Sequence, residues 1–210
     1  MIISEDIYQE LRSKDKILSD LIDQHGPMTI DTTRDATRFE ALVRSVLHQQ
    51  LTRHAADAIY SRMVELLGGS LTPQDLVRIE LQTLKTCGLS QAKALAIQGL
   101  AQAIVEKKLN LKLLESLDDI EVFEILCSYR GIGIWTAQMF CIFQLNRIDI
   151  WPSSDYGIRK GFSKAYSLDH LPSPKELDQI GNQFKPYRTI LAWYCWRAAE
   201  SDKKSIKIPL

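Results

Sequence analysis

The sequence lacks an excess of charge of either sign and has no long apolar segment. Its 26 basic and 26 acidic residues cancel, which argues against a protein that coats nucleic acid by net electrostatic attraction. No apolar run approaches the ~20 residues that a membrane-spanning helix needs, and the N-terminus does not show the pattern of a secretory signal. The composition therefore predicts an ordinary globular protein of the cytosol.

Cysteine and histidine are scarce, and neither has the spacing of a metal site. The four cysteines form no C-x-x-C pair and stand in apolar surroundings, so we interpret them as reduced core residues. They are Cys87, Cys127, Cys141 and Cys195. His48 and His54 are six positions apart, a spacing that does not place two side chains on one face of a helix. These patterns do not favour a disulfide scaffold or a side-chain metal centre.

Alternating strand patterns are also missing, whereas helical periodicity recurs along the chain. Residues 4–24 carry apolar side chains at helical spacing, and we expect one helix there. The stretch "SQAKALAIQGLAQAIVEKK" is apolar almost all round, which predicts a central, buried helix. The pattern as a whole predicts an all-α protein of nine or ten helices arranged in two lobes.

A pair of glycines interrupts the helical pattern in "YRGIGIW" and is followed at once by another apolar helix. Gly131 and Gly133 permit a sharp turn and close backbone approach. The helix after them begins with free N–H groups, which can bind a phosphate with help from the helix dipole. The segment predicts a helix-hairpin-helix over about 118–146, although an ordinary tight turn between packed helices fits this stretch alone equally well.

Asp155 is a lone acid in "WPSSDYGIRKGF", among basic neighbours. An Asp just before a helix is commonly an N-cap, which stabilises by ~1 kcal/mol, and for Asp155 alone this is the simpler interpretation. The combination of the glycine pair with an aspartate at this spacing favours a functional role for Asp155 beyond that of a helix cap.

Several motifs together resemble one family. "GIGIWTA" followed by "WPSSDYGIRKGF" resembles the helix-hairpin-helix (HhH-GPD) DNA glycosylase superfamily, and in particular its 3-methyladenine DNA glycosylase II (AlkA-like) branch. "VRSVLHQQLTRHAADAI", "CGLSQAKALAI" and "PYRTILAWYCW" agree with that branch in order and spacing. The resemblance implies a single glycosylase domain over residues 1–210, in the compact form without an N-terminal β-domain, whose two lobes flank a DNA-binding cleft.

The resemblance also implies the chemistry. Asp155, at the end of a catalytic loop at about 147–156, matches the catalytic aspartate. Trp135 stands where bifunctional relatives have the lysine that forms a Schiff base, which predicts a monofunctional enzyme. Such an enzyme of base excision repair flips alkylated purines such as 3-methyladenine and 7-methylguanine out of the duplex and hydrolyses their N-glycosidic bond. The expected base-pocket residues are Trp135, Met139, Trp196, Trp193 and Tyr156, of which Trp193 is also readily explained as a core residue.

The remaining assignments concern DNA and ions. The expected DNA-contacting or duplex-plugging residues are Gln49, Gln50, Leu51, Thr52, Gly131, Gly133, Thr136, Arg159 and Lys160, with Arg130 and Lys93 as further phosphate contacts. The two glutamines are equally explained as polar residues at a helix end. No cofactor is required and no iron–sulfur cluster is expected, but a structural Na⁺ or K⁺ would be held by the backbone carbonyls of Cys127, Tyr129 and Ile132. The expected partner is double-stranded DNA with alkylated bases, bound by a monomer, in the bacterial cytoplasm at the nucleoid or in a eukaryotic nucleus.

Two alternatives fit the same sequence. The same fold would serve as a non-catalytic module that binds damaged DNA, which the small Thr52 as a plug and the zero net charge favour weakly. A bifunctional glycosylase/lyase is the other alternative, and Trp135 in place of the lysine argues against it.

Overall fold

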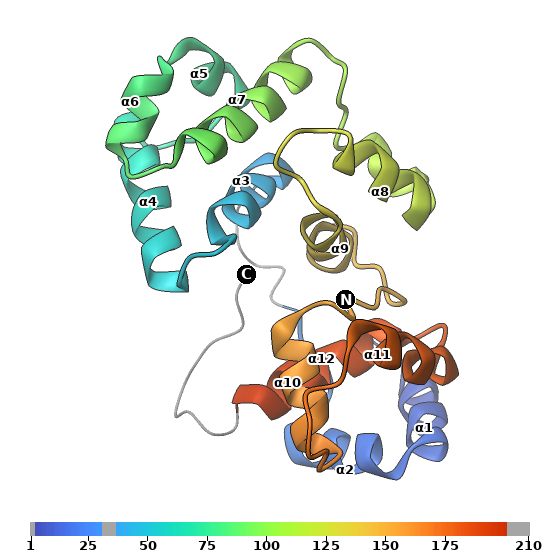
Figure 1. The fold of residues 1–210 in the computed structure, drawn as a ribbon. Coiled ribbons are helices and arrows are strands. Elements are labelled where there is room, and N and C mark those ends of the chain that lie inside the picture. Colours follow the sequence, from blue (N-terminus) through green and yellow to red (C-terminus); the bar gives the residue numbers. More distant parts are fainter. Residues whose placement is uncertain (1–2, 31–36, 201–210) are drawn as a thin grey trace. The chain divides into compact units, whose positions relative to one another are not determined.

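The computed structural model describes residues 3–30 and 37–200, and this part of the chain consists of helices and the loops that join them, without strands (Figure 1). It contains twelve α-helices and two short 3₁₀ helices, more than the nine or ten expected. The all-α class is confirmed. No helix within the described ranges is both long and apolar enough to cross a membrane.

The chain divides into two compact units, as the two predicted lobes require. Of the described residues, 3–30 and 146–200 form the first unit and 37–145 form the second. The first unit contains α1 (Glu5–Lys14), α2 (Lys16–His25), α10 (Tyr156–Ala165), α11 (Pro174–Gly181), η2 (Asn182–Phe184) and α12 (Arg188–Glu200). The second contains α3 (Arg38–His48), α4 (Arg53–Leu66), α5 (Pro73–Arg78), α6 (Leu81–Thr86), α7 (Gln91–Val105), η1 (Leu113–Ser116), α8 (Asp119–Cys127) and α9 (Ile134–Phe143).

The single helix predicted over residues 4–24 is wrong, because the chain breaks at Asp15. That residue has extended backbone, with φ −153° and ψ 123°, and its side chain accepts the N–H of Leu18 at 2.7 Å. A short acidic side chain that captures a nearby backbone N–H favours a helix start over a helix interior. Asp15 therefore ends α1 and caps α2.

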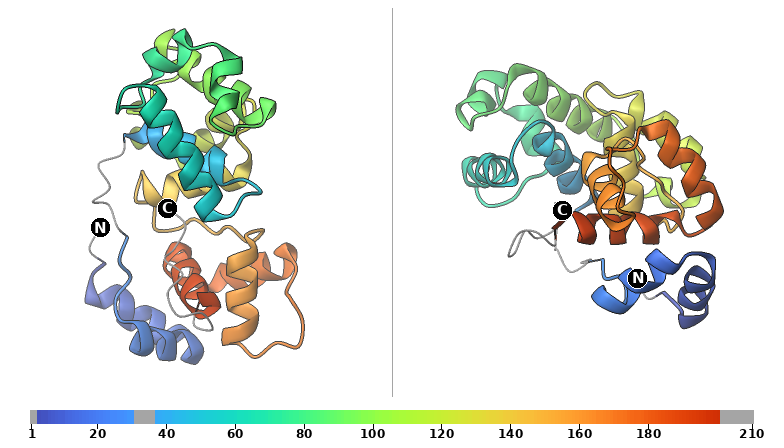
Figure 2. Two further views of the ribbon diagram at one scale, coloured as in Figure 1. Left: turned by 90° about the vertical axis from the view of Figure 1, so that its left-hand side faces the viewer. Right: turned by 60° about the horizontal axis from the view of Figure 1, so that its bottom comes forward.

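The core of the first unit surrounds α12, which packs against α10 and α2. α10 and α12 lie side by side (Figures 1 and 2). Their backbones approach so closely at Gly161 that a Cβ there would lie 1.7 Å from the carbonyl oxygen of Cys195. Ile158 and Phe162 of α10 are buried in the same unit. This close packing fixes the start of α10, where Asp155 stands.

The second unit is built on α7, which packs against α3, α5 and α6. Its buried face consists of small and medium residues, including Ala94, Ile97 and Leu100. The expected central helix is present, but it is buried on one face only, because Gly99, Gln102 and Val105 lie on an exposed face. α8 and α9 pack on each other and are joined by the glycine-containing turn, so a helix-hairpin-helix is present in this unit.

The cysteines are free in this structure. Cys87, Cys141 and Cys195 are buried, as expected of core residues, but Cys127 is exposed. The expectation of a core position is therefore wrong for Cys127, which is the last residue of α8.

Candidate functional site

Asp155 caps the N-terminus of α10 and is held there by two hydrogen bonds. Its Oδ1 accepts the backbone N–H of Ile158 at 2.8 Å and the indole N–H of Trp196 at 2.9 Å. The N-cap interpretation is thus correct, and a carboxylate in this position also lies at the positive end of the helix dipole. The side chain is half-buried, so a carboxylate is held in a defined place and keeps some access to solvent.

The buried thiol of Cys195 on α12 lies within the electrostatic influence of Asp155. Burial, and after it the negative charge of Asp155, raises the pKa of the Cys195 thiol on α12. The thiol therefore stays protonated and Asp155 has no competing anion there. The carboxylate of Asp155 can therefore act as a single negative charge on a positive group that binds beside it.

The loop before Asp155 is anchored to the start of α12. The Thr189 hydroxyl, fully buried, accepts the N–H of Ile150 at 2.8 Å and donates to the carbonyl of Arg147 at 2.9 Å. Arg188 forms a two-pronged ion pair with the carboxylate of Asp149, with both N–O distances at 2.8 Å. These contacts fix the backbone that leads into Asp155.

The aromatic candidates in this unit differ widely in exposure. Trp193 is 3 % exposed, and its indole N–H donates to the carbonyl of Thr29 at 3.1 Å, so it is a core residue. Trp196 is 6 % exposed and bonds to Asp155. Tyr156, directly after Asp155, is 65 % exposed. Tyr156 is therefore the one of these three rings whose face is open to solvent.

The hairpin between α8 and α9 has the backbone that the glycines predict. Gly131 adopts φ +82°, and a Cβ there would lie 2.5 Å from the Cβ of Ala96. Gly133 is the N-cap of α9 and is exposed, and no side chain caps this helix. The next residue, Ile134, is 49 % exposed. The first N–H groups of α9 thus stand at an exposed turn.

Gln49 ties the end of α3 to this hairpin. Its side-chain amide donates to the carbonyl of Gly131 at 2.9 Å and to the hydroxyl of Thr136 at 3.1 Å. Thr136 is 1 % exposed and its hydroxyl is a partner of Gln49, whereas the assignment of Thr136 as a DNA contact stays a prediction. The side chain of Gln49 therefore has a structural role, because it links the end of α3 to the α8–α9 hairpin.

The next three residues form the tip of the loop between α3 and α4. Gln50 is exposed and adopts the left-handed region with φ +57°, which is uncommon for a residue with a side chain. Leu51 is an apolar side chain that is 39 % exposed. Thr52 caps α4, and its hydroxyl accepts the N–H of Ala55 at 3.3 Å. Of the two residues predicted to plug the duplex, Thr52 therefore uses its hydroxyl to cap α4, whereas the apolar side chain of Leu51 is partly exposed.

Lys93 has a structural role that the sequence did not reveal. Its ammonium donates to the carbonyls of Leu47 at 2.6 Å and Gln49 at 2.7 Å, at the C-terminal end of α3. Burial lowers the pKa of Lys93. Two of the three ammonium donors of Lys93 are directed into the protein, which argues against a phosphate contact, and that assignment stays a prediction.

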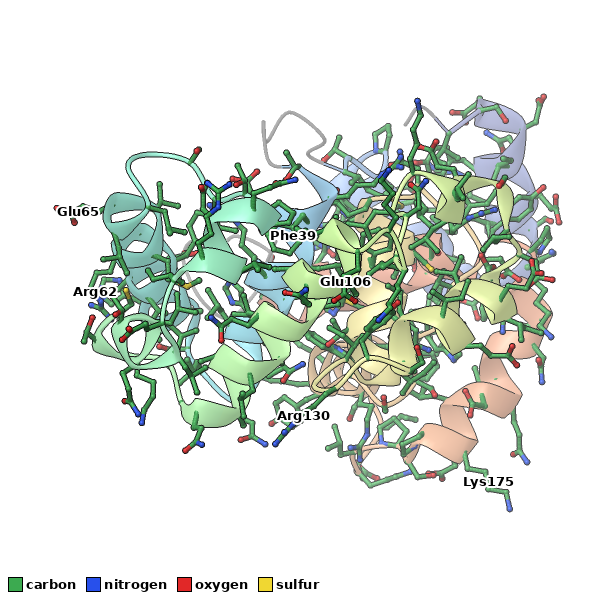
Figure 3. The ribbon with its side chains drawn as sticks, turned by 90° about the horizontal axis from the view of Figure 1, so that it is seen from above. Phe39, Arg62, Glu65, Glu106, Arg130 and Lys175 are labelled. Atoms are coloured by element: carbon green, nitrogen blue, oxygen red, sulfur yellow. The ribbon has the colours of Figure 1, made fainter. Side chains whose placement is uncertain are left out.

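The other candidates are placed as follows. Arg130 lies in the hairpin, and its side chain extends outward (Figure 3). Lys160 is exposed, whereas the Arg159 guanidinium donates to the carbonyl of Pro172 at 2.7 Å. Trp135 is half-buried and Met139 is 7 % exposed, both on α9.

The carbonyls predicted to hold an alkali cation belong to one short turn. Cys127 ends α8, Tyr129 and Ile132 follow in the hairpin, and the N–H of Ile132 donates to the Tyr129 carbonyl at 3.1 Å. Backbone carbonyl oxygens are hard, neutral donors of the kind that an alkali cation accepts. The donor set therefore fits such an ion.

Comparison with known proteins gives a consistent result. Residues 43–186 match the model of the HhH-GPD superfamily of base excision DNA repair proteins. The DNA-3-methyladenine glycosylase 1 of Schizosaccharomyces pombe is 32 % identical over 165 residues, which cover 77 % of this chain and 72 % of that protein. The alkylbase DNA glycosidase-like protein mag2 of the same organism is 28 % identical over 200 residues, 93 % of this chain and 94 % of that protein.

A solved structure extends the similarity to three dimensions. The 3-methyladenine DNA glycosylase of S. pombe in complex with abasic DNA superimposes with a TM-score of 0.83 at 28 % identity, covering 91 % of this chain and 95 % of that one. That protein is bound to DNA, and its fold is shared almost throughout.

Proposed function

The chain belongs to the HhH-GPD superfamily of base excision DNA repair proteins, and on this basis we propose that it is a monofunctional DNA glycosylase that removes alkylated purines. Its substrate class is double-stranded DNA that contains 3-methyladenine or 7-methylguanine, and the names of its relatives support this class. The observation that carries the proposal is the carboxylate of Asp155, held at the start of α10 by Ile158 and Trp196.

The chemistry requires little beyond such a carboxylate. An alkylated purine carries positive charge and leaves readily, so a strong general acid is not needed. As the N-glycosidic bond breaks, positive charge develops on the deoxyribose, and a fixed negative charge stabilises that transition state. The carboxylate can also orient or deprotonate the attacking water.

Monofunctional action follows from the side chain at position 135. Trp135 has no amine and cannot form an imine with the sugar, so strand cleavage through a covalent intermediate is not expected. We expect borohydride to trap no covalent protein–DNA adduct during base release. A trapped adduct would favour the bifunctional class instead.

DNA binding is proposed for the exposed hairpin and the α3–α4 loop. The N–H groups of Gly131, Gly133 and Trp135 would bind a phosphate, as uncapped helix starts do, and Arg130 adds a cation at the same turn. Leu51 would fill the gap left by the flipped nucleotide. This use of backbone donors explains how a chain without net charge can bind DNA.

The remaining assignments are part of the same proposal. Tyr156 offers an aromatic face to a cationic base, an interaction of about 0.5–2 kcal/mol. Trp135 and Met139 stay predictions for base contacts, as do Gln50, Arg159 and Lys160 for DNA contacts. We propose a structural Na⁺ or K⁺ at the carbonyls of the α8–α9 turn, a monomeric enzyme, and a location with the genome, in the bacterial cytoplasm or the eukaryotic nucleus.

The decisive experiment compares wild type with Asp155→Asn on methylated DNA, with release of free 3-methyladenine and 7-methylguanine as the readout. Asn caps helices as well as Asp does, so the variant keeps the fold and loses the charge. We expect base release to fall by about 100- to 1,000-fold, the range typical of removing one preorganised electrostatic group. Equal rates in the two proteins would remove Asp155 from the mechanism, and tight lesion binding without release by wild type would favour the binding module.

A further inference from the structure

The geometry points to Trp196 as a positioning residue that holds the carboxylate of Asp155 for base removal. The inference rests on the proposed function and deepens it, because it gives Trp196 a role other than stacking on the flipped base. The observation behind it is the 2.9 Å hydrogen bond from the indole N–H of Trp196 to Oδ1 of Asp155. These residues stand 41 positions apart, on α12 and at the start of α10.

The burial of Trp196 argues against base stacking as its main role. A ring that stacks on a base must present a face to it, yet Trp196 is only 6 % exposed. In contrast, its N–H is directed at the one acidic side chain that the mechanism uses. Tyr156, at 65 % exposure, has the open ring that a stacking residue needs.

The helix packing leaves little room at Gly157, beside this pair. A Cβ on Gly157 would lie 3.0 Å from Cδ1 of Trp196 and 3.1 Å from Oδ1 of Asp155. One helical turn later, Gly161 lets α10 approach the backbone of α12 at Cys195. The absent side chain at 157 therefore allows the indole to reach the carboxylate, and the close approach of α10 and α12 maintains the contact.

Two donors act on the same oxygen and define the direction of the carboxylate. The backbone N–H of Ile158 and the indole N–H of Trp196 both donate to Oδ1, at 2.8 and 2.9 Å. Hydrogen bonds to a charged acceptor are short, directional and stronger than neutral ones. A charge that is fixed before the reaction begins stabilises the transition state without the cost of reorganisation. Trp196 thus contributes to kcat through Asp155.

The test is Trp196→Phe, which keeps an apolar aromatic ring and removes the N–H. We expect kcat for 7-methylguanine release to fall by about 10- to 100-fold, the loss of one charge-assisted hydrogen bond, with little change in KM. The matched control is Tyr194→Phe on the same helix, which removes a buried donor to the carbonyl of Gly26 at 2.7 Å. The control should lose comparable thermal stability and keep its kcat.

A second variant disturbs the contact between Asp155 and Trp196 while the protein stays folded. Gly157→Ala adds one methyl group against the Asp155–Trp196 pair at a helical position where alanine is otherwise favourable. We expect a folded protein with reduced kcat. Unchanged kcat in both Trp196→Phe and Gly157→Ala would overturn the inference, as would a rise in KM alone, which indicates base stacking.

A spectroscopic readout tests the hydrogen bond without any activity measurement. The four tryptophans give four indole N–H signals in a ¹⁵N-labelled sample, and the Trp196→Phe variant identifies that of Trp196. In Asp155→Asn this signal should move upfield, because a neutral amide oxygen accepts more weakly than a carboxylate, while the Trp193 signal stays. An unmoved Trp196 signal refutes the contact. Absence of base release by wild type, with the signal moved, instead refutes the proposed function and with it the catalytic meaning of the bond.

Discussion

Gly161→Ala is the substitution whose effect follows most directly from the packing of α10 on α12. The added Cβ would lie 1.7 Å from the carbonyl oxygen of Cys195, whereas such contacts essentially never fall below 3.0 Å. The two helices would have to separate by about 1.3 Å, and close-packed interiors do not absorb such a shift without loss of contacts. The neighbouring atom is backbone, so no side chain can rotate away.

The expected cost is set by opposing effects. Overpacking of a core costs about 1–3 kcal/mol and sometimes more, and a forced separation along a helix pair belongs at the upper end. Alanine in place of glycine inside a helix returns about 0.5–1 kcal/mol. We expect a net loss of about 2–3 kcal/mol in unfolding free energy, or roughly 4–12 °C in Tm for a chain of this size. Base release should also fall, because the start of α10 carries Asp155.

The matched control is Gly99→Ala, in the exposed part of α7. Nothing lies within 4 Å of a Cβ built there, so only the gain in helix propensity remains. This variant should be stabilised by about 0.5–1 kcal/mol and should release bases like wild type. Urea denaturation followed by circular dichroism measures both. If Gly161→Ala is as stable as wild type, the close contact between α10 and α12 is not present in solution and the argument for the placement of Asp155 fails.

Three further predictions concern the loops that carry candidate residues. Arg188→Met removes the two-pronged ion pair with Asp149, in which the Arg188 side chain is 23 % and the Asp149 side chain 26 % exposed. The free energy of unfolding measured in urea should fall by about 2 kcal/mol, and base release should fall with it. An active and equally stable variant would show that the pair does not hold the loop. Leu51→Ala should slow base release several-fold in a single-turnover assay without loss of stability, because the side chain is exposed and is the residue proposed to plug the duplex. Thr52→Ala should do the reverse, losing about 1 kcal/mol of stability with the cap of α4, and a larger activity loss in Thr52→Ala than in Leu51→Ala would reverse the assignment of the plug.

Features that depend on residues close together in the sequence can be predicted from the sequence alone. The helical class, the turn at Gly131 and the N-cap role of Asp155 each follow from residues within a few positions of one another. The break at Asp15 belongs to the same class and was missed, because the apolar spacing continues across it and hides an N-cap in the middle of the pattern. The spacing of Gly157 and Gly161, one helical turn apart, was a signal of close helix packing that could have been recognised.

The partners of the site residues were beyond the reach of the sequence. Nothing near Lys93 indicates that its ammonium caps α3, and nothing near Thr136 indicates that its hydroxyl accepts a hydrogen bond from the Gln49 amide. For this reason the sequence alone predicts both residues as DNA contacts. Polar side chains are directed by whatever donors and acceptors the packed helices bring beside them, and those come from segments distant in the chain.

The sequence by itself determined which residue carries the charge and which turn can adopt a positive φ, because an ionisable side chain and a missing Cβ are properties of single positions. Only the tertiary structure decided how that charge is held. The indole of Trp196 reaches Asp155 because α10 and α12 approach to backbone contact at Gly161, and this depends on the packing of two helices rather than on any local preference.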